Sequence, residues 1–418
     1  MSSTRIRELA NLIQINTAKV DDWLQQHSLP TPSFDKDGPV DLQIDSHDIQ
    51  QARVTAMEAS LELNDLLVGP TMLLRPVLNG SALQAIYRFD IPSKVPLDGH
   101  VSFEELAKQC NLYEPDLRRL IRFAIVYHRV FQELDEGFVS HTAASRKLVE
   151  DPNSMAGVGA MFDEAIQAFD QTVNALETMK GPEPNKSGWN IANKTDLPIY
   201  EYHASRPALA RRFAGAMATF TQGLGLSPKF LAEGYPWTSV TGGKGTVVDV
   251  GGSTGHISVA LAQVAPGLRF IVQDLPEVIN GTREPLPDSI ASRVEFMEHD
   301  FFQEQPVKAD IYLFRQIFHN WSDPYCIKIL KAVIPALKPG ARIVANDHLV
   351  PRPGEMSLLQ ERAVRDMDCI MLSLFNARDR EEKDWVKIFE QADPRFTHIK
   401  VWMPEGASLA IVEAVWSG

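Results

Sequence analysis

Cysteine and long hydrophobic segments are scarce in this sequence. Only three of its 418 residues are cysteines, Cys110, Cys326 and Cys369, and they lie far apart. Because no CxxC pair or zinc-type spacing occurs, neither a disulfide framework nor a structural metal site is expected. The first residues form a polar amphipathic stretch, and no apolar segment approaches the length of a membrane span. We therefore expect a cytosolic protein.

Basic residues are also fewer than acidic ones. The chain has 41 lysines and arginines against 54 aspartates and glutamates, a net charge of −13. Binding to nucleic acid or to an anionic membrane requires a cationic face, so neither partner is expected. The length, together with 44% hydrophobic and 23% charged residues, suits a globular protein with two domains.

The N-terminal part has the pattern of a helical arm. Apolar residues recur at helical spacing over residues 1–27 and again over 46–78. The segment between them, 28–47, has five charged residues and three prolines and is predicted to be a linker.

A helix, a turn, a second helix and a hairpin are predicted in the next segment. Two short helices are expected within 101–120, and a hairpin follows, with strands at 130–134 and 138–140. This order predicts a winged-helix unit near residues 80–150. Because the chain is acidic, contact between subunits is a better role for it than DNA binding.

Strands and helices alternate in the C-terminal part. Residues 151–235 are predicted to be mostly helical, with a break near 181–193. After about residue 237 the alternation predicts a largely parallel sheet with helices on both faces. The predicted strands are 245–250, 269–273, 294–299, 311–314 and 342–347, followed by a hairpin of 398–402 and 409–415 that is compatible with an antiparallel edge of the sheet.

The strongest local motif is a strand that runs into glycines. Gly251, Gly252 and Gly255 follow the strand at 245–250 and precede an apolar helix. Glycine allows a sharp turn and the close approach of a ligand. Asp274 follows Gly255 by 19 positions, at the end of the next strand, where a carboxylate could accept hydrogen bonds from both ribose hydroxyls.

The details of this turn separate two cofactors. The spacing is Gly-Gly-x-x-Gly instead of the dinucleotide pattern GxGxxG, and Asp249 lies two residues before the first glycine. A carboxylate there would repel the pyrophosphate of a nicotinamide dinucleotide, whereas it would attract an ammonium group. The motif therefore favours S-adenosylmethionine.

Four motifs together resemble the fungal O-methyltransferase family, which is similar to the plant caffeate and flavonoid type. They are Val-Asp-Val-Gly-Gly-Ser-Thr-Gly at 248–255, Gln-Asp-Leu-Pro at 273–276, His-Asp-Phe-Phe at 299–302 and Phe-His-Asn-Trp-Ser-Asp at 318–323. The resemblance implies an α/β, Rossmann-like class I methyltransferase domain behind a mainly helical winged-helix dimerisation domain, and a homodimer. The implied division is an arm at 1–75, the winged-helix domain at 76–150, a helical linker and substrate-pocket region at 151–235 and the cofactor domain at 236–418.

The resemblance also implies roles for individual residues. Asp274 contacts the ribose in this scheme, and Asp300 and Phe301 contact the adenine; Leu275 and Arg315 complete the cofactor site with Asp249 and the three glycines. By family position the acceptor pocket contains the apolar side chains of Phe213, Met217, Phe220, Met367, Met371 and Phe375. His128 is a further candidate for contact with the substrate. Carboxylates with the spacing of a magnesium site do not occur, so a metal-independent reaction is expected.

A histidine follows the predicted strand 311–314. Open α/β sheets bind ligands outside the carboxyl ends of their strands, which is where His319 is expected. An imidazole can remove the proton of a phenol, and the resemblance makes His319 the catalytic base, oriented by Asp347 and Asp379. The sequence departs from the wider family at Asn320, where Asp is usual, and at both orienting positions, where Glu is common.

Two other functions remain open at this point. Some members of this fungal family catalyse dehydration or pericyclic reactions with bound S-adenosylmethionine as a fixed positive charge, and here Arg315, His319 and His128 could supply the donors. A non-enzymatic winged-helix regulator is the third hypothesis, and the cofactor motif and His319 argue against it.

Overall fold

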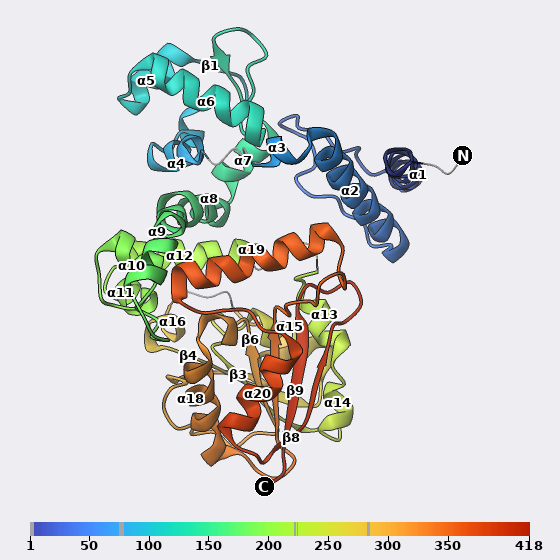
Figure 1. The fold of residues 1–418 in the computed structure, drawn as a ribbon, viewed down its shortest axis with the longest axis vertical. Helices are drawn as coiled ribbons and strands as arrows, with labels where there is room; N and C mark the ends of the chain where they lie inside the picture. Colours follow the sequence, from blue (N-terminus) through green and yellow to red (C-terminus); the bar gives the residue numbers. More distant parts are fainter. Residues whose placement is uncertain (1–3, 75–78, 221–222, 224, 282–284) are drawn as a thin grey trace. The chain divides into compact units, whose positions relative to one another are not determined.

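The computed structural model describes residues 4–74, 79–220, 223, 225–281 and 285–418, so the end of the predicted helical stretch 46–78 lies outside the described residues. The chain divides into two compact units (Figure 1). The first contains residues 1–166, 211–219 and 356–363, and the second contains the remainder. None of the described helices is long and apolar enough to cross a membrane.

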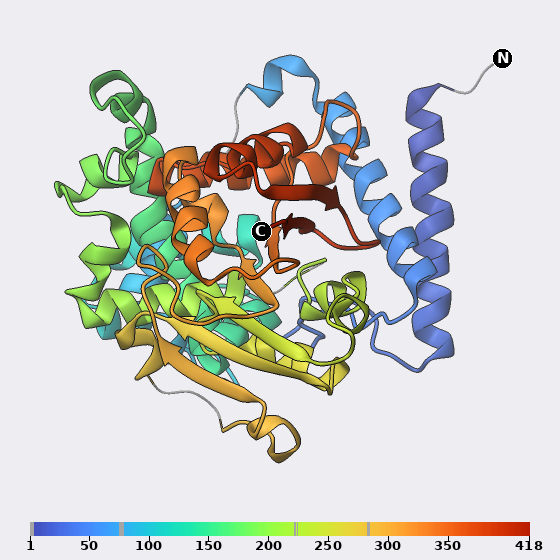
Figure 2. The ribbon, with the colours of Figure 1, turned by 90° about the horizontal axis from the view of Figure 1, so that it is seen from below.

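The first unit begins with a pair of long helices. Helices α1 (Arg5–Gln26) and α2 (His47–Val68) lie side by side (Figure 2), and the predicted linker between them has no regular structure up to residue 46. Buried alanines on α2 let α1 approach closely, and Arg5 pairs with Glu62 at 2.5 Å. The two predicted helices are therefore confirmed.

A small core in the first unit contains a helix pair and a two-stranded sheet. Helices α5 (Phe103–Cys110) and α6 (Glu114–His128) confirm the two predicted helices, although α6 continues eight residues past the predicted end at residue 120. The strand β2 (Phe138–Val139) pairs antiparallel with β1 (Val101–Ser102). The segment 130–134, predicted as the strand partner, makes only an isolated bridge from Gln132 to Ser140. The predicted hairpin is therefore present only as this antiparallel bridge, with two backbone hydrogen bonds between Gln132 and Ser140 at 3.0 Å, while the regular strand β2 pairs with β1.

Further helices complete the N-terminal half of the chain. The predicted break near 181–193 is shorter than expected, because a helix begins at Gly188 after an irregular segment at 179–187. The short elements are α3 (Pro70–Leu73), α4 (Ser81–Arg88), η1 (Pro92–Lys94), α7 (Ala143–Glu150), α8 (Pro152–Gly159) and the π-helix η2 (Ala160–Ala165). They are followed by α9 (Ile166–Thr178), α10 (Gly188–Asn193), α11 (Ile199–Ala204), α12 (Pro207–Phe220), α13 (Pro228–Gly234) and α14 (Trp237–Val240).

A seven-stranded sheet forms the centre of the second unit. Its order is β5-β4-β3-β6-β7-β9-β8, and the first five strands in this order are parallel. Strand β9 pairs antiparallel with both β7 and β8, so the late hairpin closes one side of the sheet as expected. All seven predicted strands are confirmed: β3 (Gly245–Val250), β4 (Leu268–Asp274), β5 (Val294–Glu298), β6 (Ile311–Arg315), β7 (Arg342–Asp347), β8 (Phe396–Trp402) and β9 (Ala410–Trp416).

Helices cover both faces of this sheet, as the alternation predicts. Successive residues of β3 show why, since Val247 belongs to one apolar core and Val248 to the other. A strand buried on both faces is mostly apolar, which explains the β-branched residues that precede Asp249 in β3. The helices that follow the strands are α15 (His256–Val264), α16 (Pro276–Ile279), α17 (Asp288–Ala291), α18 (Asp323–Val333), α19 (Leu358–Phe375) and α20 (Glu382–Ala392), with short 3₁₀ turns η3 (Phe318–Asn320) and η4 (Ile334–Ala336).

Two cross-strand ion pairs in this sheet differ in burial, and this difference predicts unequal contributions to stability. Buried Glu413 on β9 accepts a hydrogen bond from the Tyr235 hydroxyl at 2.6 Å and pairs with Arg342 on β7 at 2.8 Å. Exposed Glu295 on β5 pairs with Arg269 on β4 at 2.6 Å. Glu413→Ala leaves two partners without their acceptor and is expected to lower the free energy of unfolding by about 3 kcal/mol.

The matched control for that change is Glu295→Ala. It removes an exposed pair of the same chemistry, and it is expected to lower the free energy of unfolding by no more than about 1 kcal/mol. Urea unfolding followed by tryptophan fluorescence measures both variants. Equal losses would contradict the assigned difference in burial.

Candidate active site

The glycine turn lies at the carboxyl end of β3 and leads into α15. Gly251 and Gly255 have φ values of +72° and +82°, which residues other than glycine rarely adopt. A Cβ atom on Gly251 would lie 2.5 Å from the Cδ1 atom of Ile317, and one on Gly255 would lie 2.9 Å from the Phe296 ring. The glycines are therefore required by packing within the protein as well as by the turn, a reason that the sequence pattern does not reveal.

Two carboxylates lie beside this turn. Asp249 is buried and accepts a hydrogen bond from the Ser258 hydroxyl at 2.7 Å. Burial raises the pKa of Asp249 to about 6, against the lowering effect of that bond, and the neighbouring Asp274 raises it further. Asp274 accepts hydrogen bonds from the backbone N–H groups of Ser253 and Leu275, both at 2.8 Å, and burial raises its pKa. Such a pair of acids favours a cationic ligand over a pyrophosphate.

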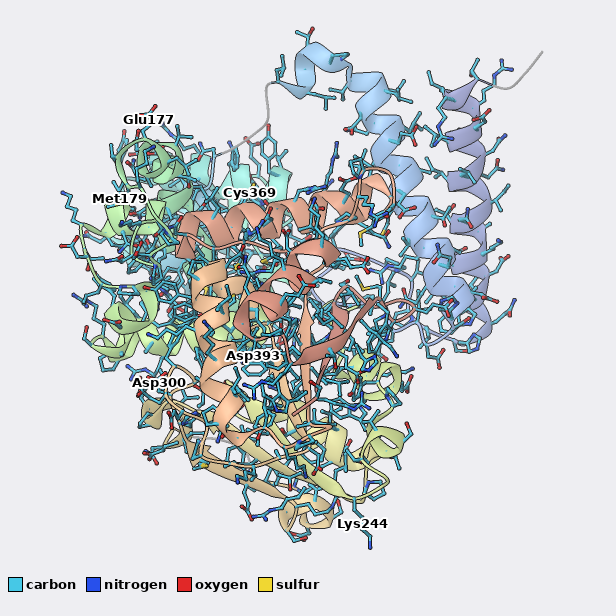
Figure 3. The ribbon with its side chains drawn as sticks, turned by 60° about the horizontal axis from the view of Figure 1, so that its bottom comes forward. Glu177, Met179, Lys244, Asp300, Cys369 and Asp393 are labelled. Carbon is cyan, nitrogen blue, oxygen red and sulfur yellow. The ribbon has the colours of Figure 1, made fainter. Side chains whose placement is uncertain are left out.

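Asp300 and Phe301 follow the adjacent strand β5. One carboxylate oxygen of Asp300 (Figure 3) accepts the backbone N–H of Phe302 at 2.9 Å, which fixes the local turn. The ring of Phe301 comes within 3.8 Å of the position that a Cβ on Gly251 would take. It also meets Trp321 edge-on, with ring centroids 6.0 Å apart. Phe301 is therefore next to the glycine turn. Leu275, the residue directly after β4, is partly exposed.

Arg315 ends the central strand β6. Its guanidinium donates hydrogen bonds to the Asn346 side chain and, at 2.6 Å, to the carbonyl of Leu226. Burial lowers the pKa of Arg315 to about 10, although Asp249 and Asp347 oppose this shift. The side chain is thus a charged group that protein oxygens already hold in place.

His319 lies in the 3₁₀ turn that follows β6. The imidazole is buried, and its Nδ1 atom is 3.5 Å from Oδ1 of Asp379, which is also buried. Burial lowers the pKa of His319, but the two acids Asp379 and Asp347 outweigh it, so the pKa is raised overall. The two groups make no hydrogen bond at this distance in the described structure, so the contact is an electrostatic one between the Asp379 carboxylate and the imidazole.

Asp347 contacts the same turn in a different way. Its Oδ2 atom accepts the backbone N–H of Phe318 at 3.2 Å, whereas Oδ1 has no hydrogen-bond partner in the described part of the chain. Burial raises the pKa of Asp347 to about 7, against the influence of His319. The two acids therefore differ, since Asp379 faces the imidazole and Asp347 holds the backbone beside it.

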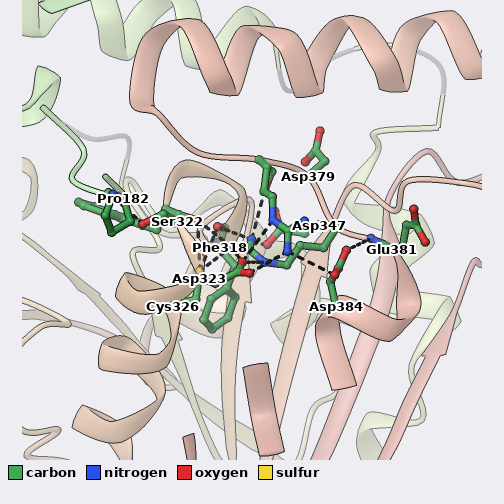
Figure 4. Close-up of polar contacts among 12 residues, drawn as sticks. Pro182, Phe318, Ser322, Asp323, Cys326, Asp347, Asp379, Glu381 and Asp384 are labelled. Atoms are coloured by element: carbon green, nitrogen blue, oxygen red, sulfur yellow. Dashed lines mark hydrogen bonds and ion pairs between the residues drawn. The ribbon is translucent and has the colours of Figure 1, made fainter. Parts of the chain in front are cut away.

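Arg380 clamps this turn from inside the protein. Its guanidinium donates to the carbonyls of Phe318 at 2.9 Å and Trp321 at 2.7 Å, the residues on either side of the stretch containing His319. It also pairs with Asp323 at 2.9 Å and contacts the Cys326 sulfur at 3.1 Å. Figure 4 shows Phe318, Asp323 and Cys326 gathered at this turn. The sequence contains no signal for this role, because an arginine in a polar run reads as a surface residue.

The predicted acceptor-pocket residues are divided between the units. His128, Phe213 and Met217 belong to the first unit, and Phe220, Met367, Met371 and Phe375 belong to the second. In the second unit Met371 and Phe375 are buried. The Phe375 ring stacks on Tyr200 at 5.5 Å, and Tyr200 stacks on Trp321 at 6.1 Å. Tyr200, which the sequence does not single out, therefore links Phe375 to the aromatic residues behind Phe301.

The fold and this site define a class of protein. A doubly wound sheet carries an acid-rich glycine turn at its carboxyl end, with a histidine and an aspartate paired nearby. Together these features describe an α/β enzyme with a nucleoside-type cofactor of cationic character.

Comparison with known proteins identifies the family. The family model of the O-methyltransferase domain matches residues 191–394. The grayanic acid biosynthesis cluster O-methyltransferase of Cladonia grayi is 49% identical over 415 residues, covering 99% of this chain and 88% of that protein. The O-methyltransferase pyvH of Aspergillus violaceofuscus is 46% identical over the full length of both chains. The chain belongs to the O-methyltransferase family, and it is an S-adenosylmethionine-dependent O-methyltransferase.

A solved structure supports the fold. OxaC in complex with sinefungin and meleagrin superposes with a TM-score of 0.73 and 22% identity, covering 97% of this chain and 98% of that one. S-adenosylmethionine carries a sulfonium and an ammonium group, and both suit a site in which the carboxylates of buried Asp249 and half-buried Asp274 have raised pKa values.

The Arg380 clamp generates a prediction about activity. Arg380→Ala removes the donors that hold the carbonyls on both sides of His319, so kcat is expected to fall about 100-fold because the base is misplaced. The positive charge of Arg380 also lowers the pKa of His319, so the acidic limb of the pH profile should move to higher pH in the variant. Steady-state kinetics between pH 5 and 9 measure both effects.

Arg378→Ala is the matched control. Arg378 pairs with the same Asp323 at 2.7 Å, but its side chain is 44% exposed and makes no bond to the 318–321 backbone in the described structure. We expect kcat within about threefold of the wild-type value, in line with a surface ion pair. Equal losses in the two variants would contradict the role assigned to Arg380.

Proposed function

We propose that this enzyme transfers the methyl group of S-adenosylmethionine to a hydroxyl of an aromatic or polyketide-type secondary metabolite, with His319 as the general base. The buried contact between His319 and Asp379, at the carboxyl end of the sheet, carries this proposal. The relative from Cladonia grayi is named for a biosynthesis cluster, which supports a secondary metabolite as the acceptor.

The chemistry needs two contributions from the protein. The cofactor, when bound, supplies a methyl group activated by the sulfonium. A phenol has a pKa of about 10 and is a weak nucleophile at neutral pH, so the protein must remove its proton as the oxygen attacks. Nε2 of His319 accepts this proton, and the carboxylate of Asp379 stabilises the imidazolium that results. Asp347 fixes the turn through Phe318, which keeps the imidazole in position.

The cofactor residues have complementary roles in this proposal. Asp274 accepts hydrogen bonds from the ribose hydroxyls, because each carboxylate oxygen has a lone pair left after its backbone bond. Asp300, Phe301 and Leu275 enclose the adenine, and Gly251, Gly252 and Gly255 let the chain turn beneath the cofactor. Asp249 near the end of β3 and Arg315 at the end of β6 contribute the charges beneath the glycine turn, one negative and one positive.

The N-terminal part completes the proposal. The helices α5 and α6 with the small β1–β2 sheet form a winged-helix dimerisation domain, and the enzyme acts as a homodimer. Val126 and Tyr127 of α6 are 66% and 54% exposed, and such apolar side chains suit a contact between subunits.

The direct test uses methyl-labelled S-adenosylmethionine and an extract of polyketide-type metabolites. The wild-type enzyme is expected to release S-adenosylhomocysteine in equal amount to the labelled methyl ether. His319→Ala should lower the transfer rate at least about 100-fold, because general base catalysis is lost. Calorimetry of cofactor binding, unchanged in the variant, shows that the site is intact.

Two results would count against this function. Full methyl transfer by His319→Ala would remove the assigned base. Tight cofactor retention without turnover, accompanied by an isomerised or dehydrated product, would instead support pericyclic or dehydration chemistry.

The coupling of His319 to Asp379 predicts a pH dependence. Only the neutral imidazole accepts a proton, so kcat/KM should fall as the pH drops through the raised pKa of His319, above its ordinary value of about 6.5. Asp379→Asn removes an anion that raises this pKa, so the acidic limb should move to lower pH while kcat decreases. Asp366→Asn, which changes an exposed residue of α19, should leave the profile unchanged. An unshifted limb in Asp379→Asn would contradict the coupling.

A further inference from the structure

His348 is a second buried histidine beside the proposed base. It follows the last residue of β7, Asp347, and its side chain is only 8% exposed. Its ring centroid lies 5.9 Å from that of His319, and the two ring planes are tilted by 31°. Neither the sequence motifs nor the proposed proton transfer assigns it a role.

Both ring nitrogens of His348 lack a hydrogen-bond partner within the described structure. Burying a polar atom without a hydrogen-bond partner costs free energy. In native proteins such atoms are therefore rare, except where a ligand or a water molecule completes the hydrogen bonds. His141 provides the contrast within this chain. That histidine is fully buried in the first unit, and its two nitrogens bond to the Ser145 hydroxyl and the Val95 carbonyl, each at 3.0 Å.

The charges around His348 decide its chemical form. Burial lowers its pKa to about 4; Asp379 opposes this shift, and His319 and Arg315 add to it. The imidazole is therefore neutral at physiological pH, with one nitrogen as a donor and the other as an acceptor. A histidine with so low a pKa is a weak base, so it does not duplicate His319, but it can bind an oxygen.

The position of His348 is fixed by the backbone on both sides. The residue before His348, Asp347, accepts a hydrogen bond from the backbone N–H of Phe318. The residue after His348, Leu349, forms a parallel β-bridge with Arg380. The N–H of Val350 donates to the Arg380 carbonyl at 2.9 Å. The imidazole is thus held next to His319 by the same segments that hold the turn of the base, as a binding group for a reacting molecule must be.

We propose that His348 binds the acceptor, by donating a hydrogen bond to a second oxygen next to the hydroxyl that His319 deprotonates. This inference rests on the proposed role of His319. Two imidazoles with ring centroids 5.9 Å apart can each bond to one of two oxygens on adjacent carbons of an aromatic ring. The favoured acceptors are therefore aromatic rings with two adjacent oxygen substituents, and His348 selects which hydroxyl is methylated.

The experiment compares two isomers, catechol and hydroquinone, which differ only in whether their hydroxyls are adjacent. Binding is measured by calorimetry on the enzyme loaded with S-adenosylhomocysteine, where no methyl group can be transferred. The wild-type enzyme is expected to bind catechol at least about tenfold more tightly, from one additional hydrogen bond in a buried site. His348→Phe keeps a ring but no nitrogen, and it should lose this preference while binding hydroquinone within about threefold of wild type.

Two further variants make the result specific. His348→Gln retains a donor near the position of Nε2 and should recover part of the catechol preference. His398→Phe replaces a histidine on the edge strand β8 and should retain all of it. Melting temperatures and the affinity for S-adenosylhomocysteine, unchanged across the variants, show that the fold and the cofactor site are intact.

The outcomes separate this inference from the proposed function. A wild-type enzyme without a preference for catechol, including one that binds neither isomer, overturns the inference, as does a preference that persists in His348→Phe. Methyl transfer to catechol is followed in parallel with S-adenosylmethionine. A preference that depends on His348 without any methylated product supports the inference and contradicts methyl transfer as the proposed function.

Discussion

Arg380 connects the two segments on which the chemistry depends. Its side chain holds the backbone on either side of His319, and its neighbour in the chain, Asp379, faces the imidazole. A guanidinium keeps its charge when buried, and its planar fork suits several oxygens at once. One residue therefore fixes both the base and the position of its acid. The rest of the site can be understood as groups placed around this fixed turn.

Burial gives the acids of the site different properties. Asp249 and Asp274 lie near the glycine turn with raised pKa values, so a bound cation would stabilise their charged carboxylates. Asp379 and Asp347 instead raise the pKa of an imidazole, which makes it a better proton acceptor. The same residue type thus serves cofactor binding in one place and proton transfer in another. What differs is the neighbouring group, a bound cation or a histidine.

The two histidines show the same principle. His319 and His348 are both buried, and their ring centroids are 5.9 Å apart. The Asp379 carboxylate lies 3.5 Å from Nδ1 of His319 and helps to raise the pKa of that imidazole, whereas burial lowers the pKa of His348 to about 4. One imidazole is suited to accept a proton and the other to remain neutral and donate a hydrogen bond. Together they describe a site for an acceptor with more than one oxygen.

The sequence by itself determined the seven strands, the glycine turn and the order of the acids, because strand patterns and turn residues are local properties of the chain. It also placed Asp274 and His319 at strand ends, since parallel strands end at one edge of a sheet. It did not reveal that Val139 pairs with Val101, that Arg380 is buried or that His348 lies beside His319. Those facts depend on contacts between residues distant in sequence, and burial, which sets the pKa of each group, exists only once these contacts form. The tertiary structure alone decided which charges meet.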